Sequence, residues 1–333
     1  MNILITGGAG FIGSAFVRML AHERSDWKLV VYDKLTYAGN LANLKEVEGK
    51  YEFIKGDIAD REKIHNVLRE HEIDQIVNFA AETHVDRSIM SGLEFIETDV
   101  LGTYNLLAEA REKGIQKYLQ VSTDEVYGSI AEGKWTEESP LLPNSPYAAS
   151  KTGGDLQVRA SFQTYGQPVI ITRASNNYGP YHYPEKVIPL FITNLLENKK
   201  VPLYGDGMNM RDWLYVDDHC RGILAVLEKG NIGEIYNIGS EEELTNLDLT
   251  NIILKELGFG SEMIEPVKDR AGHDRRYALD STKMQKLGWA PQVSFAEGIK
   301  TTIAWFKANE AWWKPLKDGT YQEYYRQQYQ ERK

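Results

Sequence analysis

Residues 2–14, NILITGGAGFIGS, decide the fold of this 333-residue chain. A short apolar run is followed by Gly7, Gly10 and Gly13 in a G-x-x-G-x-x-G spacing, and helical spacing begins at once. A tight turn of this kind needs glycine, because the backbone must approach a pyrophosphate closely and the helix N-terminus must offer its N–H groups. Glycines between a strand and a helix are the context that this site requires. The stretch therefore predicts a βα unit that binds a dinucleotide.

Further βα units follow this first one. Apolar runs typical of buried strands lie at 2–6, 29–33, 51–57, 75–81, 118–122 and 169–173. Segments with helical spacing lie between them, at 11–22, 61–71, 93–113 and 147–165. This alternation predicts an α/β fold of the Rossmann type, a doubly wound parallel sheet with right-handed crossovers.

The regular alternation of predicted strands and helices becomes less clear from about residue 173. We expect residues 1–172 to form the dinucleotide-binding domain, with 213–240 returning to it as one more short strand and its surroundings. Residues 173–212 and 241–333 are expected to form a smaller, mixed C-terminal domain that binds the substrate. Within it, residues 176–186 and 201–213 are rich in Gly, Pro, Tyr and Asn and are predicted to be loops. Helices are expected near 247–257 and 296–310, and the aromatic segment 305–329 is expected to be a terminal helix packed on the body.

Composition restricts the class of partner. The formal net charge is −10, which is unlike the basic surface of a nucleic-acid-binding protein. The single cysteine, Cys220, allows no disulfide within the chain. No apolar run approaches the ~20 residues of a membrane span, and no basic segment followed by an apolar run resembles a signal peptide. No His, Asp or Glu grouping has metal-ligand spacing. We expect a cytoplasmic protein without metal, nucleic acid or membrane contacts.

The second predicted strand favours NAD over NADP. Asp33 lies 20 residues after Gly13, where a carboxylate accepts hydrogen bonds from the adenosine ribose and repels a 2′-phosphate. Lys34 comes next, and its positive charge would soften that exclusion. Asp57 and Ile58 end the third strand, where the adenine is expected; capping of a loop is the competing interpretation of Asp57.

Tyr147 and Lys151 form the candidate base. Ser145 is a suitable N-cap and Pro146 a suitable first helical residue, so Tyr147 and Lys151 are expected on one helix face. A tyrosine hydroxyl has an ordinary pKa near 10, and a nearby ammonium favours the phenolate. Such a pair can take a hydroxyl proton while hydride leaves the same carbon.

Together with the glycine motif, this pair resembles the extended short-chain dehydrogenase/reductase family over nearly the whole chain. The resemblance implies that Thr123 contacts the substrate hydroxyl beside Tyr147. Asp124 and Glu125, which follow directly, add an acid and a base. Oxidation of a sugar hydroxyl acidifies the hydrogen on the next carbon, so a carboxylate can remove it while a carboxylic acid protonates a departing hydroxyl. Neighbouring carboxylates tend to separate their pKa values, which suits this division.

Five stretches resemble the dTDP-glucose 4,6-dehydratase branch of that family: TDEVYG (123–128), AAETHVDRSI (80–89), SNNYGPYHYPEKVIP (175–189), RDWLYVDDHCRGI (211–223) and DRAGHDRRYALD (269–280). Ala271 stands where proline is expected, which removes no functional group. The resemblance implies a lyase that oxidises carbon 4 of dTDP-glucose, eliminates water across carbons 5 and 6 and returns hydride to carbon 6. It assigns the carbon 5 proton to Glu125 and the departing hydroxyl to Asp124.

The resemblance also implies the ligand contacts. Those for NAD are Gly7, Gly10, Phe11, Ile12, Gly13, Asp33, Lys34, Leu35, Thr36, Asp57, Ile58, Phe79, Ala80, Ala81, Thr98, Tyr147, Lys151 and Asn177. Those for the nucleotide sugar are His84, Ser88, Thr123, Asn176, Lys186, Val187, Pro202, Tyr204, Arg211, Asn246, Arg270 and His273. Arg211 and His273 are expected at the diphosphate, since arginine suits bidentate phosphate contact.

Other readings stay open. A UDP- or CDP-glucose 4,6-dehydratase, a 4-epimerase or a decarboxylase shares the cofactor motifs, although an epimerase needs no acid pair after Thr123. A catalytically inactive NAD-sensing module would be expected to lose Tyr147 or Lys151, and both are present. We further expect a homodimer paired through the helices at 93–113 and 147–165, and a place in deoxysugar synthesis, with rhamnose as the expected end product.

Overall fold

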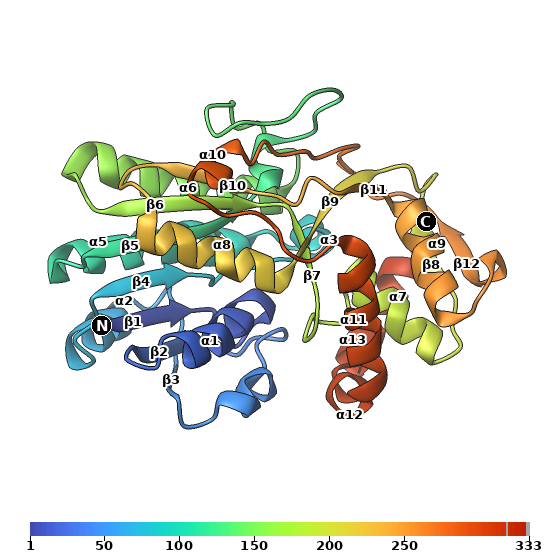
Figure 1. Cartoon of the computed structure of the whole chain (residues 1–333), viewed down its shortest axis with the longest axis horizontal. Helices are drawn as coiled ribbons and strands as arrows, with labels where there is room; N and C mark the ends of the chain where they lie inside the picture. Colours follow the sequence, from blue (N-terminus) through green and yellow to red (C-terminus); the bar gives the residue numbers. More distant parts are fainter. Residues whose placement is uncertain (318, 331–333) are drawn as a thin grey trace.

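A seven-stranded parallel sheet forms the centre of the molecule, in a computed structural model that describes residues 1–317 and 319–330 (Figure 1). The strand order is β10-β6-β5-β4-β1-β2-β3. The strands are β1 (Asn2–Thr6), β2 (Lys28–Asp33), β3 (Tyr51–Lys55), β4 (Gln75–Asn78), β5 (Lys117–Thr123), β6 (Val169–Ala174) and β10 (Ile235–Ile238). The predicted doubly wound parallel sheet is confirmed, because the chain order reverses direction on either side of β1.

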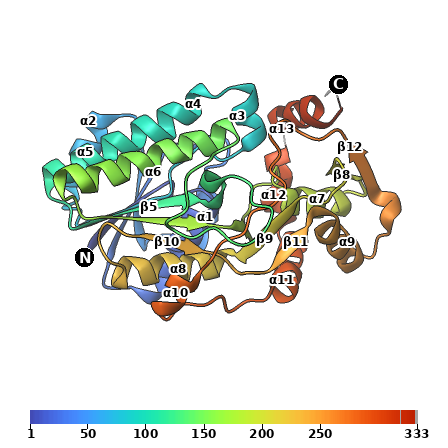
Figure 2. The ribbon, with the colours of Figure 1, turned by 90° about the horizontal axis from the view of Figure 1, so that it is seen from above.

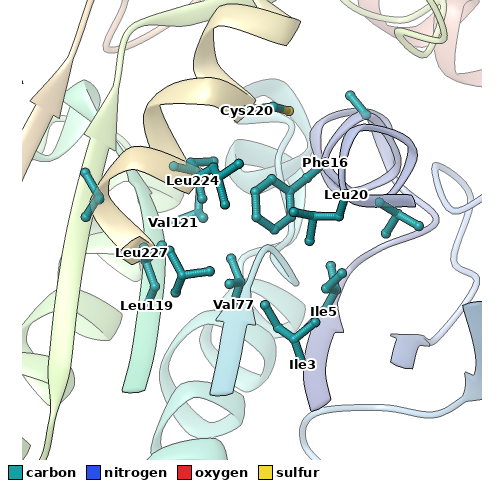
Figure 3. Close-up of a cluster of buried hydrophobic side chains, with 14 of the residues drawn as sticks. Ile3, Ile5, Phe16, Leu20, Val77, Leu119, Val121, Cys220, Leu224 and Leu227 are labelled. Carbon is teal, nitrogen blue, oxygen red and sulfur yellow. The ribbon is translucent and has the colours of Figure 1, made fainter. Parts of the chain in front are cut away.

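Helices cover both faces of this sheet (Figure 2). One face carries α1 (Phe11–Glu23), α8 (Val216–Lys229) and α10 (Thr282–Lys286); the other carries α2 (Arg61–Glu70), α5 (Thr103–Lys113) and α6 (Pro146–Tyr165). On the first face Phe16 and Leu20 of α1 meet Leu224 and Leu227 of α8 above the strand side chains (Figure 3). The core on this face of the large sheet is therefore closed by a helix that lies more than 200 residues after the first strand.

Local signals explain where α6 begins. The Ser145 hydroxyl accepts the Ala148 N–H at 3.0 Å and Pro146 occupies the first turn, as the sequence predicts. The helix predicted at 93–113 is continuous, but its hydrogen-bonding pattern changes along its length. It consists of α4 (Leu93–Phe95), the π-helical segment η2 (Ile96–Gly102) and α5, and it follows the short α3 (Val85–Met90). Such wide turns are rare and occur often at functional sites.

A second lobe packs its own core against the carboxyl end of the sheet. Two small sheets, with orders β11-β9-β7 and β12-β8, are covered by three larger helices. These elements are β7 (Asn176–Tyr178), β8 (Val201–Tyr204), β9 (Met210–Tyr215), β11 (Glu243–Thr245), β12 (Ile264–Val267), α7 (Val187–Leu196), α9 (Asn246–Leu257) and α11 (Phe295–Ala308).

Two loop predictions are wrong in part: residues 179–186 and 205–209 form the expected loops, but strands flank them. Residues 176–186 begin with β7, and residues 201–213 contain β8 and most of β9 around the turn at 205–209. Each of these strands pairs in its sheet with a partner distant along the chain, β7 with β9 and β8 with β12, and this pairing outweighs the turn residues beside it.

The aromatic tail is a chain of short helices rather than one helix. It passes through α12 (Glu310–Trp313), η5 (Lys314–Lys317), α13 (Gly319–Tyr325) and η6 (Arg326–Gln330), and Trp313 and Tyr321 are buried in the core of the second lobe. Within the ranges that the structure describes, no helix combines the length and apolar character needed to cross a membrane.

Candidate active site

One cavity of about 410 Å³ runs from the first βα turn to the second lobe. Its walls bring together all but two of the residues predicted to bind ligands, from segments that span the chain from Gly7 to His273. Thr123, Asp124, Glu125, Tyr147 and Lys151 line the same cavity. The sequence motifs therefore converge on one site at the carboxyl ends of the strands, where open α/β sheets bind ligands.

The first βα turn forms a cradle that only glycine fits. Gly7 has φ +65°, and a Cβ placed there would lie 2.6 Å from the Ala80 nitrogen. A Cβ on Gly13 would overlap the Gly7 carbonyl oxygen. The turn can therefore approach a ligand closely while α1 points its N-terminus at it, which fits a pyrophosphate.

Asp33 and Asp57 line the part of the cavity where the adenosine is expected. The Asp33 carboxylate accepts the Ala9 N–H at 2.9 Å and the Leu35 N–H at 2.7 Å, so its position is fixed at the turn. Lys34 pairs with Asp57 at 2.6 Å. The lysine charge that would soften exclusion of a 2′-phosphate is therefore held by a second carboxylate. Asp57 also accepts the Ala59 N–H at 2.9 Å, so it caps its loop while it lines the cavity.

Tyr147 and Lys151 lie on one face of α6 and are both buried. The Lys151 ammonium donates to the Val121 carbonyl oxygen at 3.0 Å. Burial, and then the charges of Glu125 and Asp99, raise the pKa of Tyr147 well above its ordinary value, and a hydrogen bond with Thr123 opposes the rise. Tyr147 thus holds its proton at neutral pH, and positive charge in the cavity would favour the phenolate.

Asp124 and Glu125 have different electrostatic surroundings. Burial and the charges of Glu125 and Asp212 raise the pKa of Asp124 well above its ordinary value. Burial also raises the pKa of Glu125, but Arg270, Arg211 and Lys186 oppose that rise. Because several cations stabilise the Glu125 carboxylate, Asp124 is the better proton donor and Glu125 the better base.

The short helix η3 (Asp124–Tyr127) holds both acids. The Thr123 hydroxyl donates to Asp124 Oδ1 at 3.2 Å and accepts the Glu125 N–H at 3.3 Å. At the other end of η3, the Tyr127 hydroxyl donates to Asn237 Oδ1 and accepts from Arg173, both at 2.8 Å. Backbone and side-chain contacts thus fix η3 at both ends, which holds two unfavourably buried carboxyl groups in place.

Cations gather at the far end of the cavity. Arg211 lies over the Tyr277 ring at 4.4 Å and donates to the Asp274 carbonyl oxygen at 2.9 Å. Arg270 lies 3.9 Å from Asp86, and its buried Nε has no hydrogen-bond partner among the described residues. Burial and the charge of Arg270 lower the pKa of His273 to about 4, so this imidazole is neutral. Among the described residues, neither buried guanidinium group has a carboxylate closer than 3.9 Å. Such a pair of cations fits an anionic ligand such as a diphosphate.

Comparison with known proteins agrees with this geometry. Residues 4–302 match the family model described as GDP-mannose 4,6 dehydratase.

The chain belongs to this family.

A dTDP-glucose 4,6-dehydratase of Streptomyces niveus is 52% identical over 95% of this chain and 96% of its own length. The crystal structure of DesIV, a dTDP-glucose 4,6-dehydratase from Streptomyces venezuelae with NAD bound, has 54% identity and a TM-score of 0.93 over 95% of this chain and 100% of that chain. A UDP-glucose 4-epimerase from Thermotoga maritima has 31% identity and a TM-score of 0.86 over 93% of this chain and 100% of that chain. The resemblance that the sequence motifs indicated is confirmed.

Two of the predicted contacts do not line the cavity of this GDP-mannose 4,6 dehydratase family member. Ser88 is buried; its hydroxyl donates to the Val85 carbonyl oxygen at 2.6 Å and accepts the Tyr147 N–H at 3.1 Å. Leu35 lies in the turn after β2, where it has φ 56° and donates its N–H to Asp33. Ser88 therefore positions the start of α6, and Leu35 positions the Asp33 carboxylate.

Several wall residues were not predicted from the sequence. His182 stacks on Phe11 at 4.1 Å, Glu185 pairs with Arg87 at 3.1 Å, and Tyr329 of the tail stacks on Tyr204 at 5.8 Å. Glu82 also lines the cavity, and burial raises its pKa to about 7. Glu82, His182 and Glu185 lie inside the stretches that carried the resemblance, whereas nothing in the spacing of the tail marks Tyr329.

Proposed function

We propose that this chain is a carbon–oxygen lyase that converts dTDP-glucose to dTDP-4-keto-6-deoxyglucose and water, with NAD as a resident cofactor. The observation that carries the proposal is the acid pair. Asp124 and Glu125 lie directly after Thr123 and line the same cavity as Tyr147 and Lys151. An oxidation at one carbon needs only Thr123, Tyr147 and Lys151. The two carboxyl groups therefore indicate a second step. The relatives at about half identity are named for that reaction.

NAD is supported by the fit of the site. The glycine cradle, the α1 N-terminus and the fixed Asp33 carboxylate are the features that a dinucleotide needs, and residues 1–172 with 213–240 are the proposed domain for it. NAD⁺ bound in this cavity supplies a hydride acceptor and a positively charged ring. Because hydride leaves carbon 4 and returns to carbon 6 of the same sugar, no net oxidation occurs.

The chain's own residues then handle three protons. Tyr147, with the Lys151 ammonium near it, takes the proton of the carbon 4 hydroxyl, which Thr123 helps to orient. Glu125 removes the carbon 5 proton that the carbon 4 ketone has acidified, and returns it to carbon 5 when carbon 6 receives the hydride. Asp124 donates its proton to the carbon 6 hydroxyl as that group leaves. The raised pKa of Asp124 and the cations around Glu125 both support this order.

The second lobe would hold the nucleotide diphosphate. Residues 173–212 and 241–333 are proposed as the nucleotide-sugar domain, with Arg211, Arg270 and Asn246 on the cavity wall. Burial of these guanidinium groups strengthens their interaction with phosphate oxygens.

The test is turnover with three substrates. Purified protein incubated with dTDP-glucose should give the 4-keto-6-deoxy sugar, detected by its absorbance in alkali, without free NADH accumulating. UDP-glucose and CDP-glucose, assayed side by side, measure the base preference, for which one methyl-sized contact is worth only ~1–3 kcal/mol. Formation of a carbon 4 epimer in place of the keto sugar would overturn the proposal in favour of an epimerase.

A homodimer is proposed as well, with support from exposed apolar side chains. Leu93, Ile96, Leu101 and Tyr104 are between 46% and 63% exposed along α4, η2 and α5. Leu156 and Tyr165 on the neighbouring α6 are 50% and 60% exposed. Patches of this kind on a soluble protein mark interfaces. A cytoplasmic location and a role in deoxysugar synthesis toward rhamnose are proposed on the same family resemblance.

A further inference from the structure

Asp99 is a buried carboxylate behind the Tyr147–Lys151 couple. It lies in the π-helical segment η2 and is 2% exposed. Its Oδ2 accepts the Ser150 hydroxyl at 2.6 Å, and Ser150 lies in α6 between Tyr147 and Lys151. The segment η2 can approach α6 this closely because α6 has glycines there: a Cβ on Gly154 would lie 2.7 Å from the Asp99 carbonyl oxygen. The wide turn and the glycines together place one carboxylate against the catalytic helix.

The negative charge of Asp99 is not needed for packing. Ser150 requires only an oxygen acceptor, which an asparagine would supply with the same shape. The other carboxylate oxygen, Oδ1, is buried without a hydrogen-bond partner among the described residues, and the Lys151 ammonium acts on the carboxylate by its charge rather than by an ion-pair contact. A buried carboxylate that lacks a direct ion pair is costly. A costly charge next to the proposed base calls for a functional explanation.

The groups that face Asp99 identify its target. Tyr147 and Lys151 flank its hydrogen-bond partner Ser150 on α6, and Glu82 lies in the segment after β4; Asp99 interacts electrostatically with all three. Lys151 lowers the pKa of Asp99, while burial raises that pKa to about 6. In the other direction, burial, then the charges of Glu125, Asp99 and Asp124, raise the pKa of Tyr147, and Asp99 is the one of these carboxylates that does not line the cavity. Asp99 is therefore ionised at neutral pH and acts on the proton of Tyr147 without touching the cavity.

We propose that Asp99 is a positioning residue for the reaction: its carboxylate fixes Ser150 at the back of α6 and its charge sets the pH at which Tyr147 gives up and takes its proton. This deepens the proposed function and rests on it for the reaction itself. A base that must take a proton from the carbon 4 hydroxyl, and then keep it through elimination, benefits from a nearby negative charge that strengthens its hold on that proton.

The experiment measures Tyr147 directly in the enzyme with its cofactor. Ultraviolet absorbance of the phenolate is followed against pH, with Tyr147→Phe as the blank for the other tyrosines. Asp99→Asn removes the charge and keeps the acceptor for Ser150. We expect its Tyr147 titration, and the acidic limb of its kcat/KM profile, to move to lower pH by about one unit, as for unit charges several ångströms apart in protein. Toward acidic pH, where wild-type Asp99 takes up a proton, the two proteins should converge.

Two variants separate charge from shape. Ser150→Ala removes the hydrogen bond and leaves the charge, so it should lower the rate without moving the titration. Glu112→Gln removes one negative charge from the surface of α5 and should change neither. An unmoved Tyr147 titration in folded Asp99→Asn would overturn the proposal. Because the phenolate titration needs no substrate, this failure is distinguishable from absence of dTDP-glucose turnover, which would instead contradict the proposed function.

Discussion

At the scale of single residues, the groups around Asp124 and Glu125 favour a proton donor at Asp124 and a base at Glu125. Asp124→Asn keeps size and hydrogen bonding but cannot donate a proton readily. We expect this variant to oxidise substrate and to exchange the carbon 5 hydrogen with solvent deuterium, while elimination slows by about 10²–10⁴. Glu125→Gln should lose both exchange and elimination yet still reduce bound NAD⁺. Single-turnover NADH absorbance, deuterium incorporation and product formation measure the three steps.

Tyr147→Phe is the matched control for these two variants. It removes the proposed base of the first step, so little NADH should form in a single turnover and the later steps should not be reached. Normal carbon 5 exchange in Glu125→Gln, or wild-type elimination in Asp124→Asn, would contradict the division of labour.

Asp99 also makes stability depend on pH. Its pKa is raised by burial from 3.8 to about 6 in the folded protein, so the stability linked to its protonated form is complete below about pH 4 and is lost as the pH rises through about 6. Asp99→Asn does not titrate and avoids this loss. Its free energy of unfolding relative to wild type should therefore rise between these pH values, by up to about 3 kcal/mol. Urea denaturation at acidic and neutral pH measures the difference; a gap that does not change with pH would contradict the burial of a charged Asp99.

The sequence predicts residues of the site unevenly, for physical reasons. Tyr147 and Lys151 are found because a helix fixes their spacing, and Gly7 and Gly13 because backbone geometry admits no other residue there. Asp99 lies in a helical segment whose residue spacing does not single it out. Its proposed role depends on the packing of α6 against that segment, which the local sequence does not reveal. The acid and base assignment of Asp124 and Glu125 likewise depends on Arg270 and Arg211, which lie far along the chain.

At the scale of elements, the first βα turn should be the most sensitive to added volume. A Cβ on Gly13 overlaps the Gly7 carbonyl oxygen, so Gly13→Ala must shift the start of α1 away from the turn. We expect the purified variant to carry little or no bound NAD and to lose activity with it. Cofactor content after release by denaturation, measured by absorbance, tests this.

Gly319→Ala is the control, because a Cβ at Gly319 meets no atom within 4 Å. It should retain wild-type cofactor content. Full cofactor content in Gly13→Ala would show that the turn accommodates the methyl group and that the cradle is looser than its geometry indicates.

Helices and strands are predicted correctly from sequence where the residues of the element itself carry the pattern. The strands β1, β2, β5 and β6 of the large sheet have five to seven residues that are almost all buried, as a sheet covered on both faces requires. The strands β7 and β8 have three and four residues beside turn residues, so their pairing with distant segments is decided by the second lobe and not by local sequence.

At the scale of the whole molecule, the exposed apolar side chains of α4, η2, α5 and α6 should be covered by a second copy of the chain. Light scattering at micromolar concentration should give the mass of a dimer. Replacing both Leu93 and Ile96 by Glu places charges in this patch, so it should yield a monomer.

Leu142→Glu is the matched control, since Leu142 is 57% exposed in the loop between η3 and α6, away from that patch in sequence. It should remain dimeric. A monomeric wild type, or a dimeric double variant, would contradict pairing through these helices.

The late position of α8 and β10 has a consequence for synthesis of the chain. When a ribosome has released residues up to Ala174, the edge of β6 that β10 later occupies is still open, and the apolar face above β4 and β5 still lacks Leu224 and Leu227. Domains tend to fold as units during translation, and open strand edges and uncovered apolar faces invite aggregation. The large sheet must therefore wait for some sixty more residues, which include part of the other lobe, before β10 and α8 complete it. Chaperone binding to this protein on the ribosome should peak in that interval.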